Sequence, residues 1–145
     1  MGEEMSSKYI GFIVSLLFAV VFFSPGTSAQ ESPLQVDGAT TVDVAVAKTL
    51  FDRGVPFVDV RSKSGWETSH IPKAHYLELF SAFNEANLLK IVAKDQEVVI
   101  YCGGPGCKRS SKACAKAASW GFKKVYYFRG GFPVWRAAGF PTDPP

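Results

Sequence analysis

Apolar and polar residues follow two patterns along this chain, one typical of buried strands and one typical of helices. Three short apolar runs have the length and continuous hydrophobicity of strands that are buried on both faces of a parallel sheet. They cover residues 57–60, 97–101 and 124–128. Around them, apolar residues recur at the spacing of a helix. The predicted helices cover residues 43–53, 81–92, 110–119 and 133–138. Strands that alternate with helices predict an α/β domain with a parallel sheet covered by helices.

A longer apolar run lies near the amino terminus and is of another kind. Residues 10–23 carry no charge, but they are fewer than the about 20 apolar residues that a membrane-spanning helix needs. Small residues at 27–29 then match a signal-peptidase site before Gln30. We therefore expect residues 1–29 to be a signal peptide and the protein to be exported, into a periplasm or another extracytoplasmic space.

The remainder of the chain divides into a polar, turn-rich linker over residues 30–38 and a single domain over residues 39–145. An alternative for the leader is an uncleaved anchor, which is the only contact with a membrane that the sequence predicts.

Composition narrows the function classes. The chain has 145 residues and a net charge of +3, which suits a small anionic partner and lacks the basic stripe typical of nucleic-acid binding. Three cysteines form no disulfide framework, and their spacing lacks the paired CxxC pattern of a zinc site. We predict no metal, no other cofactor and no nucleic-acid partner.

The candidate catalytic residues lie in the loop between the apolar run at residues 97–101 and the predicted helix at residues 110–119. Three glycines there leave main-chain N–H groups free to form an anion-binding nest at a helix N-terminus, a setting that stabilises a thiolate. We predict that Cys102 is the nucleophile. The residues predicted to bind the substrate around it are Gly103, Gly104, Gly106, Cys107, Lys108, Arg109 and Ser110. The alternative is a glycine-rich turn with a buried structural cysteine.

Three separated motifs resemble those of the rhodanese-like domain family. The first spans residues 57–74, with Asp-Val-Arg at its strand end, the second joins Tyr101-Cys102 to Arg109-Ser110, and the third spans residues 129–141. The resemblance implies a doubly wound α/β domain around a five-stranded parallel sheet, flanked by helices on both faces.

The resemblance also implies an activity. In that family a cysteine, here Cys102, takes sulfane sulfur from a donor such as thiosulfate or a polysulfide and holds it as a persulfide. A thiol or cyanide-like acceptor, on a small molecule or on a partner protein, then removes it. Asp59 and Arg61 are expected to hold the loop, with Arg61 also within reach of the substrate, and His70 is expected to cap a turn.

The loop departs from the family pattern in two ways. Arg109 follows Cys102 by seven positions, whereas the family pattern has five and related phosphatases have six, so the predicted cradle is wider than either. Cys107 is an additional thiol in the loop. It could resolve a Cys102 persulfide, form a redox couple with Cys102 or line the pocket. The alternatives to a sulfurtransferase are therefore a thiol–disulfide redox protein, a non-catalytic module that binds sulfur species and a phosphatase.

Overall fold

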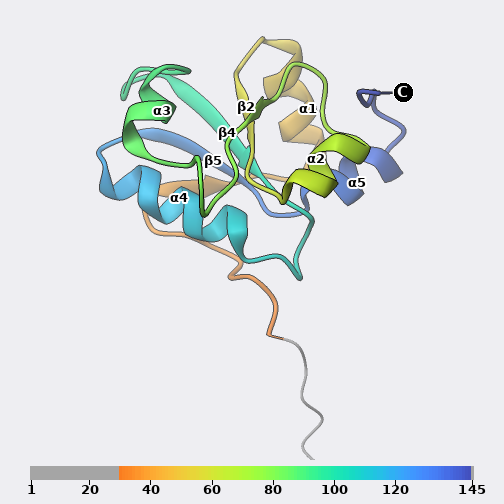
Figure 1. Ribbon diagram of the computed structural model, residues 1–145, viewed down its shortest axis with the longest axis horizontal. Coiled ribbons are helices and arrows are strands. Elements are labelled where there is room, and N and C mark those ends of the chain that lie inside the picture. Colours follow the sequence, from red (N-terminus) through yellow and green to blue (C-terminus); the bar gives the residue numbers. More distant parts are fainter. Residues whose placement is uncertain (1–29, 145) are drawn as a thin grey trace, which may run out of the picture.

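The computed structural model describes residues 30–144, which form one five-stranded sheet with helices around it (Figure 1). All neighbouring strands pair in parallel, in the order β1-β5-β4-β2-β3. The strands are β1 (Ala39–Thr41), β2 (Phe57–Asp59), β3 (His75–Tyr76), β4 (Glu97–Tyr101) and β5 (Lys124–Phe128). The predicted leader, residues 1–29, lies outside the described residues. Among residues 30–144, no helix has the length and apolar character needed to cross a membrane.

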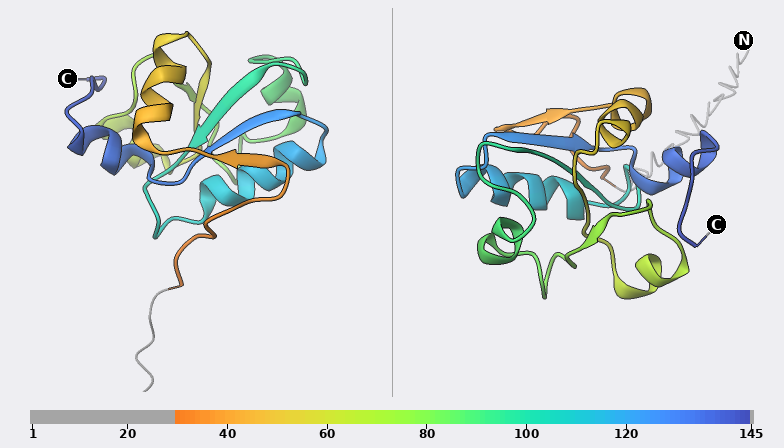
Figure 2. Two further views of the ribbon diagram at one scale, coloured as in Figure 1. Left: turned by 180° about the vertical axis from the view of Figure 1, so that it is seen from behind. Right: turned by 90° about the horizontal axis from the view of Figure 1, so that it is seen from above.

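Helices cover both faces of the sheet (Figure 2). They are α1 (Val44–Asp52), α2 (Lys63–Thr68), α3 (Glu85–Leu89), α4 (Arg109–Ser119) and α5 (Gly131–Ala137). One core cluster joins the sheet to α3 and α4, and a second joins it to α1 and α5. The predicted doubly wound α/β fold is therefore confirmed.

The central strand β4 supplies both clusters because successive side chains of a strand point to opposite faces. Val98 and Ile100 pack toward α4, whereas Val99 and Tyr101 pack toward α1 and α5. Cys102 continues the alternation and lies in the cluster on the α4 face. The alternation along β4 thus directs the side chain of Cys102, the predicted nucleophile, toward the start of α4.

The predicted helix over residues 81–92 is wrong in its extent, since α3 covers only Glu85–Leu89. The residues before it form a turn in which the Glu78 carboxylate accepts hydrogen bonds from the main-chain N–H groups of Phe80 and Ser81. Asn84 then caps the helix, because its side chain accepts from the Asn87 N–H. Hydrogen bonds from the local main chain to the Glu78 and Asn84 side chains therefore replace the first turn of the predicted helix.

The predicted linker, residues 30–38, is hydrogen-bonded to the domain through its first residues. The Ser32 N–H donates to the Pro105 carbonyl oxygen at 2.7 Å, and the Tyr127 hydroxyl donates to the Pro33 carbonyl oxygen at 3.1 Å. Arg129 donates to the Ser32 carbonyl oxygen. This segment consequently lies against the cysteine loop and the end of β5.

Candidate active site

The cysteine loop, residues 102–108, begins where β4 ends and leads into α4. On either side of β4, the last residues of β2 and β5 reach the same edge of the sheet, because Asp59 and Phe128 are both in register with Tyr101. Parallel α/β sheets commonly bind ligands at this edge. The fold therefore brings the loop and the Asp59-Arg61 motif to neighbouring strand ends.

Cys102 is completely buried beneath the loop, with none of its surface exposed. Its Sγ lies 3.0 Å from the Ser110 Oγ, 3.3 Å from the Cys107 carbonyl oxygen and 3.4 Å from the Ser110 nitrogen, which donates its N–H to the sulfur. Ser110 stands in the first turn of α4, where main-chain N–H groups are free and the helix dipole is positive. Negative charge on a sulfur at this position would be stabilised.

Cys107 is the partly exposed thiol of the pair. A hydrogen bond with the Cys102 side chain and the main-chain N–H groups of Arg109 and Gly103 lower the pKa of Cys107 to about 5. The same interaction with Cys107, together with burial, raises the pKa of Cys102. The two thiols are therefore coupled, and their interaction favours the thiolate at the partly exposed Cys107 over the buried Cys102.

The two predicted cations of the loop differ in their surroundings. Lys108 is exposed immediately before α4. Arg109 forms an ion pair with Glu78, and its guanidinium lies 4.8 Å from the ring of the exposed Phe80. The Glu78 carboxylate is therefore already paired with Arg109, the arginine that the sequence predicts to attract anions. The sequence pattern did not single out Glu78, because it lies far from the loop in sequence and outside any recognised motif.

Arg61 is engaged with structural partners. Its guanidinium donates to both carboxylate oxygens of the buried Asp59, at 2.7 to 3.0 Å, and to the Ser69 carbonyl oxygen at 2.7 Å. It also lies over the Phe132 ring, 4.5 Å from the centroid. These contacts anchor the turn after β2 on the face opposite to the Cys102 side chain.

His70 belongs to the same turn and has a structural environment. Its ring stacks on Trp66 with 3.4 Å between centroids, and its Nδ1 lies 2.9 Å from the Trp66 carbonyl oxygen. Neither of these contacts joins it to the cysteine loop.

A glycine pair from the far end of the chain supports the nucleophile position. Gly131 has a φ of 60° and lies so close to Cys102 that a Cβ on it would overlap the Cys102 carbonyl oxygen. The next residue, Phe132, donates its N–H to that oxygen at 3.0 Å. Gly131 is thus required for close approach of two backbones, and the third sequence motif fixes the base of the loop.

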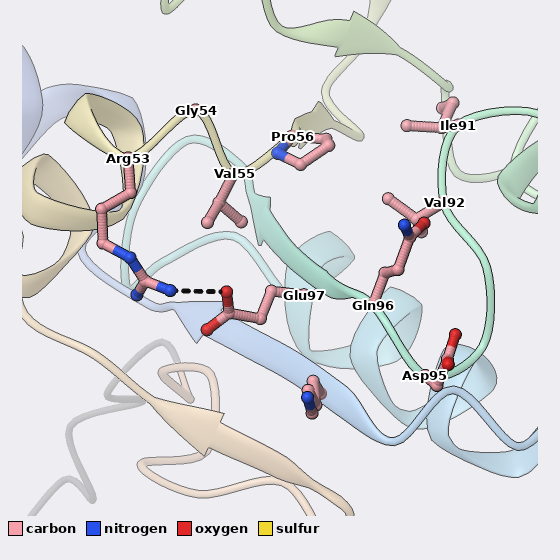
Figure 3. Close-up of a pocket in the computed structure, with 10 residues that line it drawn as sticks. Arg53, Gly54, Val55, Pro56, Ile91, Val92, Asp95, Gln96 and Glu97 are labelled. Carbon is pink, nitrogen blue, oxygen red and sulfur yellow. Dashed lines mark hydrogen bonds and ion pairs between the residues drawn. The ribbon is translucent and has the colours of Figure 1, made fainter.

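A hollow that contains none of the loop residues lies at the opposite edge of the sheet (Figure 3). It measures about 540 Å³ and is lined near the amino ends of three strands, by residues that include Pro56, Glu97 and Lys124. An ion pair between Arg53 and Glu97 crosses part of it. The size of this hollow does not mark it as the reactive site, because the thiols are elsewhere.

Comparison with known proteins agrees with this arrangement. The family model of the rhodanese-like domain matches residues 43–138. The chain belongs to the rhodanese-like domain family. The match begins at the residue that caps α1 and ends just after α5, so it contains all the strands except β1.

The individual relatives of this chain include a sulfurtransferase. The thiosulfate sulfurtransferase GlpE of Pseudomonas syringae is 32% identical over 97 residues, covering 67% of this chain and 86% of GlpE. The mitochondrial protein HIGH ARSENIC CONTENT 1 of Arabidopsis thaliana is 27% identical over 125 residues, covering 80% of this chain and 73% of that protein. The crystal structure of the BH2092 protein from Bacillus halodurans superposes with a TM-score of 0.63 at 30% identity, over 72% of this chain and 76% of that one. Sulfur transfer is therefore the activity supported at the level of the family.

Proposed function

We propose that the protein is a sulfurtransferase that moves sulfane sulfur from a donor such as thiosulfate or a polysulfide, through a persulfide on Cys102, to a thiol or a cyanide-like acceptor. The acceptor thiol belongs to a small molecule or to a partner protein. The observation that carries this proposal is the position of the Cys102 Sγ at the start of α4, in contact with the Ser110 N–H and hydroxyl.

The reaction passes through an intermediate whose negative charge depends on the groups around it. Sulfane sulfur transfer to a cysteine produces a persulfide that is readily ionised, and the site must stabilise that charge at a fixed place. Donors that are positioned before the reaction do so without a cost of reorganisation. The Ser110 N–H, the Ser110 hydroxyl and the positive end of an eleven-residue helix supply such an environment for Cys102.

Mass spectrometry after treatment with thiosulfate or a polysulfide tests the proposal. The wild-type chain should gain the mass of one sulfur atom, and fragmentation of the loop peptide should place that atom on Cys102 at equilibrium. Cys102→Ser should carry no sulfur atom at this position, because it lacks the thiol that holds the persulfide.

The matched control is Cys114→Ala, which removes the buried thiol of α4 that lies outside the loop. It should retain both sulfur uptake and turnover. The proposal is rejected if the wild-type chain takes up no sulfur, or if fragmentation places none of that sulfur on Cys102.

The proximity of the two loop thiols favours one second candidate, a thiol–disulfide redox protein that cycles Cys102 and Cys107. Mild oxidation would then remove two hydrogen atoms from the chain, and the protein would exchange disulfides with a dithiol substrate without any sulfur donor. Activity in the absence of a sulfane donor separates this candidate from the sulfurtransferase.

We also propose that the protein acts outside the cytoplasm, in a periplasm or an equivalent space, after removal of residues 1–29. The support is the apolar run and small-residue site in the sequence. Amino-terminal sequencing of the protein recovered from cells should begin at Gln30. Recovery of the full-length chain from the cytosolic fraction would contradict it.

A further inference from the structure

The two thiols of the cysteine loop differ in their access to solvent. Cys102 is fully buried, under a loop whose turn is closed by a 2.9 Å hydrogen bond from the Cys107 N–H to the Gly104 carbonyl oxygen. Cys107 is partly exposed in that same turn. A sulfur donor that arrives from solvent therefore meets Cys107 before it can reach the buried sulfur of Cys102.

The two thiols also differ in the groups around them. Main-chain N–H groups of Gly103 and Arg109 favour negative charge on Cys107. The Cys102 sulfur accepts the Ser110 N–H, but it also lies against a hydrogen-bond acceptor, the Cys107 carbonyl oxygen at 3.3 Å, to which a protonated thiol donates. Exposure therefore favours the reactive thiolate at Cys107, and burial disfavours it at Cys102.

We propose that Cys107 is the first acceptor of sulfane sulfur from the donor, and that Cys102 receives the sulfur from Cys107. This inference rests on the proposed persulfide chemistry and adds the order in which the two cysteines act. Cys107 is then a catalytic residue that exchanges sulfur with solvent, and Cys102 is the buried site that stores it.

The first step is a displacement at sulfur. With thiosulfate as donor, the Cys107 thiolate attacks the outer sulfur, a bond forms between that atom and the Cys107 Sγ, and the sulfur–sulfur bond of thiosulfate breaks. Sulfite leaves with the bonding electron pair. The products are a Cys107 persulfide anion and sulfite, and the total charge is unchanged.

The second step transfers the sulfur inward. The proton of Cys102 passes to the terminal sulfur of the Cys107 persulfide, and the Cys102 sulfur then attacks that terminal atom. The bond between the terminal sulfur and Cys107 breaks, and Cys107 leaves with the electron pair as a thiolate. A thiol with a lowered pKa is a good leaving group in such an exchange. The products are a Cys102 persulfide and a Cys107 thiolate, without net oxidation.

The same two steps in reverse deliver the sulfur to an acceptor thiolate, which attacks the persulfide on the partly exposed Cys107. Direct attack by a donor on Cys102 would instead require the loop to open, since the Cys102 sulfur has no exposed surface. The order through Cys107 needs no such opening.

A single-turnover experiment tests this order. The full chain and its variants are mixed with excess thiosulfate, quenched with acid after increasing times and analysed by intact mass and fragmentation. Cys107→Ser should load sulfur at least about 10-fold more slowly than the wild type, because the remaining thiol is buried beneath the loop and mostly protonated at neutral pH. Cys102→Ser keeps a hydrogen-bond donor beside Cys107, so it should still gain one sulfur atom, on Cys107.

Cys114→Ala is the loading control, and Cys107→Ala is a second variant that guards against a specific effect of serine. The unfolding temperature of each variant shows that slow loading does not reflect loss of the fold. The proposed order is overturned if Cys107→Ser loads on Cys102 at the wild-type rate, or if Cys102→Ser takes up no sulfur. Failure of the wild-type chain itself to gain sulfur would reject the proposed function as well, and loss of two hydrogen atoms in its place would favour the redox candidate.

Discussion

The charge state of the cysteine loop depends on residues whose roles the sequence could not separate. Both Cys102 and Cys107 stand among glycines and close to Lys108 and Arg109, so the pattern alone favours a thiolate at either position. Burial separates them, because only Cys107 has exposed surface. The predicted nucleophile is thus the buried thiol of the pair, and its position at the start of α4 suits a charged persulfide.

The pH dependence of thiol alkylation should report this difference. The pKa of Cys107 is lowered to about 5, so the thiolate fraction, and with it the alkylation rate, should rise as pH increases from 4 to 6 and level off above that. In Cys102→Ala, which removes the hydrogen-bonding partner of the Cys107 thiolate, the midpoint should move upward toward the ordinary value near 8.5. A wild-type midpoint near 8.5, measured with iodoacetamide and peptide mapping, would contradict the assignment.

Glu78 should weaken the binding of anionic donors, since it pairs with Arg109 beside the loop. In Glu78→Gln, the amide oxygen can still accept the turn hydrogen bonds from Phe80 and Ser81, but the carboxylate charge is lost. We expect KM for thiosulfate to fall by roughly threefold to tenfold, the ratio that corresponds to about 1 kcal/mol of electrostatic interaction.

Steady-state kinetics provide the measurement, and Glu97→Gln provides a matched control. Glu97 is also paired with an arginine, but it lies at the opposite edge of the sheet. Its substitution should leave KM for thiosulfate unchanged. An unchanged or higher KM in Glu78→Gln would show that Arg109 does not attract the donor.

At the level of elements, the buried strands and long helices could be predicted because their signals are local. The run at residues 97–101 coincides with β4, and Asp43 caps α1 through a 2.9 Å hydrogen bond from the Val46 N–H. The two-residue β3 and three-residue β1 are too short to give a periodic signal, and they exist because neighbouring strands pair with them. The extent of α3 depends on side chains that bind the local main chain, which periodicity does not register.

The junction between α5 and the cysteine loop should be intolerant of a side chain at Gly131. Gly131→Ala places a methyl group against the Cys102 carbonyl oxygen in a backbone conformation with positive φ. We expect it to lower the free energy of unfolding by more than about 3 kcal/mol, or to displace the loop and abolish sulfur loading.

Gly54→Ala is the control for backbone strain alone. Gly54 has a φ of 79°, but a Cβ there meets no atom within 4 Å. It should cost only about 1–2 kcal/mol and retain activity. Equal costs in urea unfolding for the two variants would refute the role of close approach.

On folding of the whole molecule, the pKa values of several thiol and phenol groups shift, some upward and one downward. Burial raises the pKa of Cys114 and of Tyr101, whereas the pKa of Cys107 is lowered. A raised pKa contributes stability that is present below the unfolded value and is lost as pH rises through the folded one. A lowered pKa contributes stability that is present above the unfolded value and is lost as pH falls through the folded one.

The urea midpoint should consequently rise between pH 5 and about 8.5 and fall again above about pH 9, the ordinary range of thiols and phenols. Equilibrium unfolding in a reducing buffer measures both slopes. Cys107→Ser should flatten the rise on the acidic side, whereas Cys114→Ala should reduce the fall on the alkaline side. A midpoint that does not change across this range would contradict both assignments.

The contact between Ser32 and Pro105 bears on the order of maturation. If the leader is removed before Gln30, the cut lies only two residues from a main-chain hydrogen bond to the cysteine loop. A peptidase must hold several residues on both sides of the cut in an extended form, so it competes with that docking. Processing would then have to precede completion of the loop, and a precursor that had already folded would be a poor substrate for the peptidase.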